Sequence, residues 1–451
     1  MRVKTSTKNV DMLHGPLWNK ILFFAAPIAL SSIIQQLFNA ADIAVVGRFA
    51  GTSAMAAVGS NSSMISLIIN LFVGLSVGAN VVISNCLGKQ DFDRAKRAVH
   101  TSIAVAILSG LFLLVFGQIL IRPLLRLMAV PEDVFELSVL YLRIYFLGMP
   151  FSMLYNFCAA ALRSKGDTQR PMVVLTCAGV ANILLNLFFV CVLNMSVEGV
   201  AIATVISQII SSLMLLYLLT KETGPLQLNF RELKIHGAIL KDIASIGVPS
   251  GLQGCVFSLS NVCIQSAINS LGTLTMAACT AVLNYEMFTV YIINSFSQAC
   301  VTFTSQNYGA GNFQRCRRVF RTSLGLGAIS MCIVSVIMLL FGQPLIRVFN
   351  ADPEVIEIGM IRIRGIMPFQ LLNMAIDVVS GGLRGLGHSF VPTAISLVGI
   401  CGVRLIWVYT VFAMFPSLAC LICAYPLSWA ITTLAIFIAY FLVSRKVLQP
   451  Q

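Results

Sequence analysis

Three carboxylates lie inside long apolar stretches of the sequence, away from the polar segments that hold most of the other acids. They are Asp42, Glu286 and Asp377. If these stretches cross a membrane, each buried carboxylate costs at least ~2.5 kcal/mol and usually marks an ion or proton path. Burial favours the protonated form and a bound cation favours the charged form, so one such group can exchange H⁺ or Na⁺ for a cationic substrate. The alternative is an acid that faces a water-filled crevice near a helix end and has no coupling role.

Polar side chains surround Asp42 in the sequence pattern. Gln35 and Asn39 precede it by seven and three residues, on roughly the same helical face, and are candidates for substrate binding. Asn182 and Asn186 share a face of a later helix, because they are spaced i, i+4. An amide donates and accepts hydrogen bonds but does not titrate. The alternative for the two asparagines is that they only hold packed helices together.

A second set of candidates lies in the other half of the chain. Asn373 is one turn before Asp377, and Glu286 directly follows Asn284 and Tyr285. Arg404 lies midway along an apolar stretch and needs a partner at that depth. Pairing with Glu286 or Asp377 would make that acid structural.

Composition defines the elements that must hold these groups. The chain has 451 residues, of which 58% are hydrophobic and only 10% charged, with a mean hydropathy of +0.89. Soluble domains carry about 25% charged residues, so the sequence predicts a polytopic membrane protein. The net charge of +13 fits cytoplasmic loops near anionic lipid better than nucleic-acid binding. The 13 Cys lie mostly in apolar runs and indicate packing residues.

Charge-free gaps predict twelve spans, and these must be helices because lipid requires each span to satisfy its own backbone. The expected spans are 18–46, 54–82, 98–121, 135–161, 172–194, 199–220, 243–270, 275–302, 322–346, 358–382, 392–414 and 418–443. Most Lys and Arg fall on one side of this topology, together with Arg2, Lys4 and Lys8. The acidic clusters Glu132-Asp133-Glu136 and Asp352-Glu354-Glu357 fall on the other. Both termini are therefore expected in the cytoplasm.

The second half of the chain repeats the first at an offset near 221 residues. Matching motifs are Gly51-Thr52-x-x-Met55-Ala56-Ala57 with Gly272-Thr273-x-x-Met276-Ala277-Ala278, Phe116-Gly117-Gln118 with Phe341-Gly342-Gln343, and Leu162-Arg163-x-x-Gly166 with Leu383-Arg384-x-x-Gly387. Six helices per half give both halves the same topology, so an axis along the membrane normal relates them. We expect an N-terminal bundle over 1–220, a cytoplasmic linker over 221–240 and a C-terminal bundle over 241–451.

Two prolines match across the repeat, and two polar residues suit a cleft between the bundles. Pro27 and Pro249 each remove a backbone hydrogen bond inside a span. They would let these helices change shape during transport, or else form static kinks. Tyr155 and Asn156 are candidates for lining the cleft.

These motifs resemble the multidrug and toxic compound extrusion (MATE) family of antiporters. The resembling segments are Pro27…Asp42…Val46-Gly47, Leu162-Arg163-x-x-Gly166-Asp167-x-x-x-Pro171 and Gln306-Asn307-Tyr308-Gly309-Ala310-Gly311. The resemblance implies a V-shaped pair of bundles that exports organic compounds in exchange for H⁺ or Na⁺. It groups Asp42, Asn182, Asn186 and Thr204 as a cation site, with Asp377 and Glu286 as further coupling acids. Many relatives have Asp where this chain has Asn186, so Asp42 is either a lone proton carrier or one ligand of a Na⁺ ion.

The resulting expectation is a plasma-membrane exporter of small organic, mainly cationic, compounds. It needs no cofactor beyond the coupling ion, binds lipid but no nucleic acid, and is a monomer. An enzyme is not expected, because His14, His100, His236 and His388 all fall in loops or at span ends. A flippase for lipid-linked saccharides is the alternative. The mixed charges within the spans disfavour it, because Arg404 is deep while Arg143, Arg362 and Arg364 lie nearer the span ends.

Overall fold

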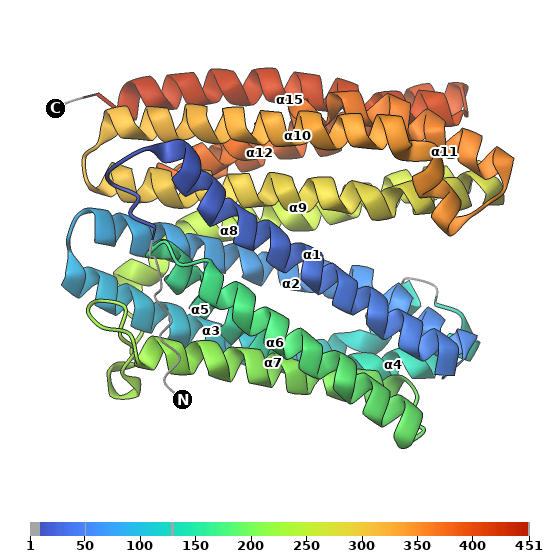
Figure 1. The fold of residues 1–451 in the computed structure, drawn as a ribbon, viewed down its shortest axis with the longest axis horizontal. Coiled ribbons are helices and arrows are strands. Elements are labelled where there is room, and N and C mark those ends of the chain that lie inside the picture. The colour runs from blue at the N-terminus through green and yellow to red at the C-terminus, as the bar shows by residue number, and fades with distance from the viewer. Residues whose placement is uncertain (1–9, 50, 128–129, 450–451) are drawn as a thin grey trace. The chain divides into compact units, whose positions relative to one another are not determined.

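The computed structural model describes residues 10–49, 51–127 and 130–449. The N-terminal Arg2, Lys4 and Lys8 lie outside the described residues, as do the side chains of Thr52, Met55, Ala56 and Asp133. Figure 1 follows the chain through its helices. Those of the first half are α1 (Leu17–Phe49), α2 (Thr52–Gly88), α3 (Phe92–Leu127), α4 (Glu132–Leu147), α5 (Met149–Ser164), α6 (Gln169–Leu187), the π-helical η1 (Phe188–Val192) and α7 (Val197–Thr220).

The second half follows the short 3₁₀ helix η2 (Phe230–Glu232), and its fifth span is divided by more π-helical segments than that of the first half. The helices of the second half are α8 (Gly237–Asn269), α9 (Thr273–Gly309), α10 (Phe313–Phe349), α11 (Pro353–Ile366), the 3₁₀ turn η3 (Met367–Phe369), α12 (Gln370–Gly385), α13 (Phe390–Ser396), the π-helical η4 (Leu397–Gly402), α14 (Val403–Trp407), the π-helical η5 (Val408–Phe412) and α15 (Leu418–Val447). Within the described ranges, 11 helical segments are long and apolar enough to cross a membrane, and 12 if the α4–α5 pair, bent by 48°, is one span. The predicted all-α fold with its transmembrane helices is confirmed.

The chain divides into two compact units. Unit 1 comprises residues 1–10 and 30–251, and unit 2 comprises 11–29 and 252–451. These boundaries differ from the bundle limits expected from the repeat, because the start of α1 belongs to unit 2 and the start of α8 to unit 1. Both helices continue through their internal prolines, Pro27 and Pro249. In each helix the boundary between the two units falls two residues after the proline. The proline therefore lies close to the point where the helix stops packing in one unit and starts packing in the other.

Glycines allow α2 and α8 to pack backbone against backbone within unit 1. A Cβ added at Gly74 would lie 2.2 Å from the backbone nitrogen of Gly251, and one at Gly78 would lie 2.3 Å from the Ile243 carbonyl oxygen. Both helices carry the small-x-x-x-small spacing that brings transmembrane helices together, with Gly247 and Gly251 on α8. This contact explains why the first half of α8 packs in unit 1.

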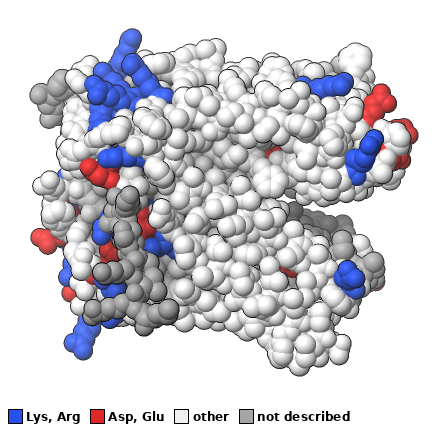
Figure 2. Space-filling model, in the orientation of Figure 1, with Lys and Arg blue, Asp and Glu red and all other residues white. Residues whose placement is uncertain are grey.

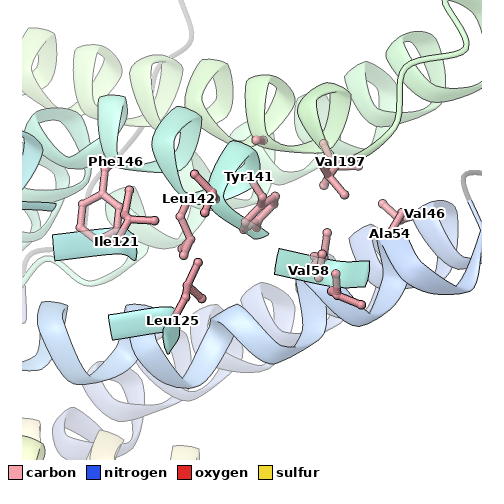
Figure 3. Packing of buried hydrophobic residues seen from close by; sticks show 14 of the residues in the cluster. Val46, Ala54, Val58, Ile121, Leu125, Tyr141, Leu142, Phe146 and Val197 are labelled. Carbon is pink, nitrogen blue, oxygen red and sulfur yellow. The ribbon is translucent and has the colours of Figure 1, made fainter. Parts of the chain in front are cut away.

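Apolar side chains fix the end of α1 in unit 1. Val46, one turn beyond Asp42, is fully buried in a cluster with Val58 of α2, Leu125 of α3 and Tyr141 of α4 (Figure 3). Phe146 and Val197 extend the cluster to the end of α4 and the start of α7. The position of Asp42 is therefore set by side chains from four other helices.

The segment expected to be a linker is bound to unit 1 by charged contacts. Glu222 accepts a hydrogen bond from Lys165 Nζ (2.9 Å) and forms an ion pair with Arg170 (2.5 Å). Burial raises the pKa of Glu222, but these two cations outweigh it and hold the pKa below its usual range. Lys96 Nζ lies 2.6 Å from Glu232 further along the segment. The segment is therefore an ordered part of unit 1.

Basic side chains hold the start of the described chain in unit 2. The Arg315 guanidinium of α10 donates to the carbonyls of Met12 (3.0 Å), His14 (2.8 Å) and Gly15 (3.0 Å). Figure 2 shows Lys and Arg gathered at this end of unit 2, where α1 and α10 begin. Phe24 of α1 meets Phe303 of α9 edge to face, with ring centroids 5.4 Å apart. These contacts attach the first half of α1 to unit 2.

Candidate cation-coupling sites

In unit 1, a hydrogen bond joins α1 to α6 at the predicted acid. Asn186 Nδ2 donates to Asp42 Oδ1 and also to Asn182 Oδ1, the second at 3.2 Å. All three side chains are buried, with Asp42 8% and Asn186 0% exposed. The i, i+4 spacing of the two asparagines on α6 makes this chain of contacts possible, since it stacks them one turn apart. Asp42, Asn182 and Asn186 thus form one polar cluster, called here the α1–α6 cluster.

The α1–α6 cluster contains one titratable group and several oxygens. Within the described residues, Asn186 Oδ1 is buried and has no hydrogen-bond partner. The carboxylate of Asp42 and the amide oxygens of Asn182 and Asn186 are ligands of the type that hard cations prefer. The cluster can therefore hold a proton on Asp42 or present oxygens to a small cation.

Two tyrosines of α4 and a glutamine of α7 border the α1–α6 cluster. Tyr141 and Tyr145 are close enough to Asp42 for electrostatic interaction, and the Tyr145 hydroxyl lies beside the side chain of Gln208. The two rings stack, with centroids 5.9 Å apart. Sequence reasoning missed these residues, although the i, i+4 spacing of two hydroxyl-bearing aromatics in one span was a usable signal.

The other residues proposed around Asp42 take no part in this hydrogen-bonded set. Thr204 donates to the Val200 carbonyl of its own helix (2.9 Å). Gln35 and Asn39 are exposed on α1, and no hydrogen bond joins either to Asp42 among the described residues.

The two candidates of α5 form hydrogen bonds within unit 1. The Tyr155 hydroxyl donates to the carbonyl of Pro171 at the start of α6 (3.3 Å), and Asn156 Nδ2 donates to the Ser152 carbonyl (2.9 Å). Both side chains are half-buried. Tyr155 therefore links α5 to α6, and Asn156 bonds within its own helix.

In unit 2, Glu286 is engaged by an arginine that the sequence placed elsewhere. Arg362 of α11 donates from Nε and Nη2 to the two carboxylate oxygens of Glu286, each at 2.8 Å. Arg362, expected nearer a span end, is 1% exposed and is therefore enclosed by protein. The expected alternative partner, Arg404, forms no ion pair with Glu286 or Asp377 within the described part of the chain. A bidentate buried pair fixes the orientation of the Glu286 carboxylate and occupies both of its oxygens, which favours a structural role for this acid.

Asp377 of α12 is the less constrained acid of unit 2. Its side chain has no hydrogen bond or ion pair among the described residues, and Arg384, two turns further along α12, interacts with it electrostatically. Arg384 donates to Gln253 Oε1 (2.6 Å), and Asn373 donates to Gln370 Oε1 (3.1 Å). Asn373 and Asp377 are therefore on the same helix but not in one hydrogen-bonded set.

A duplicated set of membrane-spanning helices with buried carboxylates inside the spans defines a class of protein, the polytopic helical transporter. Acids at such depth commonly mark ion or proton paths, and repeated bundles are a common design of secondary transporters.

Comparison with known proteins identifies the family. A family model described as MatE matches residues 27–188 and 249–410, one match in each repeat. The chain is 30% identical over 441 residues to the probable multidrug resistance protein YoeA of Bacillus subtilis, covering 95% of each chain. It is 28% identical to the probable multidrug resistance protein NorM of Thermotoga maritima, covering 86% of this chain and 84% of that protein. This chain belongs to the MATE family of multidrug efflux transporters.

A solved structure supports the fold. The structure of a MOP superfamily transporter from Pyrococcus furiosus matches with a TM-score of 0.91 at 22% identity, covering 99% of this chain and 100% of that one. The resemblance drawn from the motifs is confirmed, as is the expectation of a membrane transporter of small molecules rather than an enzyme.

Proposed function

We propose that the protein exports organic compounds in exchange for H⁺ or Na⁺, and that Asp42 is the coupling acid. The observation that carries the proposal is the hydrogen bond from Asn186 to Asp42 between two membrane-spanning helices. This hydrogen bond gives the buried Asp42 carboxylate an amide partner that can donate to its charged form and accept from its protonated form. Glu286 is less suited to coupling because Arg362 already occupies both of its oxygens.

The proton version of the mechanism uses the two faces of an amide. When Asp42 is charged, Asn186 Nδ2 donates to it, as in this structure. When Asp42 is protonated, its O–H can donate to Asn186 Oδ1 once the amide rotates, since an amide both donates and accepts. A hydrogen bond then joins α1 and α6 in both protonation states, with donor and acceptor exchanged. Protonation of Asp42 therefore changes the orientation of the Asn186 side chain on α6.

The Na⁺ version uses the oxygens of the same cluster. Na⁺ would displace the Nδ2 donor and take the Asp42 carboxylate together with the amide oxygens of Asn182 and Asn186. The free Oδ1 of Asn186 supports this version, because a buried oxygen without a partner gains most from a cation. A cationic substrate would compete with Na⁺ or H⁺ for the negative charge of Asp42. This competition is the reason for proposing cationic substrates.

The proposed function is tested by transport in proteoliposomes with a fluorescent organic cation such as ethidium. A pH gradient and a Na⁺ gradient are imposed separately, with an equal-ion control. Export driven by one gradient identifies the coupling ion. Export driven by neither contradicts the antiporter.

We further propose that both termini face the cytoplasm of a plasma membrane and that the protein is a monomer. The orientation is supported by the excess of Lys and Arg in the segments on the proposed inner side. A membrane-impermeant maleimide added to intact cells should label Glu132→Cys and Glu354→Cys above the parent chain, but not Arg94→Cys. If only Arg94→Cys were labelled, the proposed orientation would be wrong and the termini would face outward. The subunit number is tested separately, by single-molecule photobleaching in nanodiscs.

A further inference from the structure

The two repeats differ in the charged groups found at one pair of corresponding stretches. The offset of 221 residues pairs Thr204 and Gln208 of α7 with Tyr425 and Trp429 of α15. On the preceding span, the same offset brings Arg404 into the part of the second repeat that corresponds to the Asn182–Asn186 stretch of α6. The Asn182–Asn186 stretch of unit 1 contacts the Asp42 carboxylate of α1, whereas the corresponding stretch of unit 2 itself carries the Arg404 guanidinium.

Arg404 is enclosed by aromatic rings within unit 2. Its Cζ lies 4.2 Å from the ring centroid of Tyr425 and 5.7 Å from that of Trp429. The residue is 5% exposed. Its hydrogen bonding among the described residues is limited to one contact, from Nε to Ser428 Oγ at 3.3 Å. A guanidinium has five N–H donors, so the terminal nitrogens have capacity for an acceptor.

The charges around Arg404 do not cancel. Arg362 and Glu286 are close enough to Arg404 to interact with it electrostatically, and they neutralise each other through two hydrogen bonds. The group of three therefore carries one net positive charge, that of Arg404. A buried charge without a counter-ion is unfavourable, and ring faces compensate only part of that cost. An anion at the terminal nitrogens would complete the balance.

The backbone around Arg404 is irregular in a way that ordinary packing does not require. Arg404 lies on the five-residue α14, between the π-helical segments η4 and η5. π-helical turns are rare and occur frequently at functional sites. In unit 1, the π-helical η1 begins two residues after Asn186. The same irregularity thus accompanies the charged cluster in each repeat.

We propose that Arg404, with Tyr425 and Trp429, binds the anionic group of an aromatic organic compound, a carboxylate or a sulfonate. The planar guanidinium matches the two oxygens of such a group, and the half-buried Tyr425 adds an aromatic contact beside it. The proposal deepens the proposed function by adding organic anions and zwitterions to the compounds handled. It is tested by binding without any ion gradient, so it can fail while the antiport proposal stands.

The test measures binding of naphthalene-2-carboxylate to the purified full chain in phosphatidylcholine nanodiscs by isothermal titration calorimetry. The neutral analogue 2-naphthalenemethanol controls for apolar binding. The carboxylate should bind more tightly than the alcohol, and Arg404→Gln should weaken it about ten- to a hundredfold, the effect of losing charged hydrogen bonds. Arg364→Gln is the matched control, because Arg364 is an exposed arginine of α11 outside the group. It should leave the carboxylate affinity unchanged.

Two results would overturn the proposal. One is equal affinity of the wild type for the carboxylate and the alcohol. The other is equal carboxylate affinity of Arg404→Gln and Arg364→Gln, which would place any bound anion elsewhere. If Arg404→Gln does not fold, Arg404→Lys is the variant to measure. Lysine keeps the positive charge but lacks the planar guanidinium that can donate two hydrogen bonds to one carboxylate. It should weaken carboxylate binding by about three- to tenfold, and wild-type affinity in this variant would reject the site.

Discussion

The Glu286–Arg362 pair should respond asymmetrically to removal of its partners, because Arg404 is nearby. Two unit charges about 4 Å apart interact by roughly 4 kcal/mol at the effective dielectric of a protein. Breaking a buried pair costs about 3–5 kcal/mol, since one charge is left uncompensated. Glu286→Leu leaves two guanidiniums without an acid, whereas Arg362→Met leaves Glu286 with Arg404 as a substitute partner.

We therefore expect Glu286→Leu to lower the free energy of unfolding by about 3–5 kcal/mol and Arg362→Met by about half as much. The double variant should lie within roughly 2 kcal/mol of the wild type, because apolar side chains of similar volume replace a buried pair at little cost. The assay is reversible unfolding by sodium dodecyl sulfate in mixed micelles. Arg364→Met, two residues from Arg362 and exposed, is the control and should change the free energy by less than about 0.5 kcal/mol.

Two outcomes would refute this reasoning. Equal losses in both single variants would show that Arg404 does not substitute for Arg362. A double variant whose loss equals the sum of the single losses would show that the two side chains are not coupled at all.

Three shorter predictions concern unit 1 and its loops. A Cβ at Gly74 would lie 2.2 Å from backbone, against 3.4 Å for an ordinary contact, so Gly74→Leu should cost about 1–3 kcal/mol or more by the same unfolding assay. Gly325→Leu has open space and should cost little. Asn186→Asp places a second carboxylate beside Asp42, so the pair should titrate as a coupled unit and change the pH profile of export; superimposable profiles would exclude position 186 from the coupling site. The lowered pKa of Glu222 stabilises the fold above the ordinary glutamate pKa, and this contribution disappears as pH falls through the lowered value. The melting-temperature difference between wild type and Glu222→Gln should therefore shrink on acidification. A difference that does not change with pH would refute this role of the Glu222 charge.

The spans and the repeat could be predicted because they depend on local pattern. Charge-free gaps of bilayer length predict helices wherever lipid must be crossed. The family motifs around Pro27 and Gly166 then identified the MATE family. The bend between α4 and α5 was not predicted, since Gly148 carries no more signal than other glycines of the chain.

Long-range pairing was the part that sequence could not provide. Arg362 reaches Glu286 across 76 residues, and nothing in its neighbourhood distinguishes it from the exposed Arg364. The contact of Asp42 with Asn186 followed from the family resemblance, because spacing alone cannot join positions 144 residues apart. The α2–α8 contact had a readable signal, Gly74-x-x-x-Gly78, which the sequence reasoning did not use.

The central claim, that Asp42 couples export to an ion gradient, is tested most directly by Asp42→Asn in proteoliposomes. The variant keeps the shape of the side chain but has no group that titrates in the physiological range. Gradient-driven ethidium export should be lost, whereas exchange of labelled for unlabelled ethidium across the membrane, with no gradient, should persist. Asp377→Asn, the matched variant in unit 2, should retain gradient-driven export. Wild-type export by Asp42→Asn, with loss in Asp377→Asn, would contradict the account and move the coupling acid to unit 2.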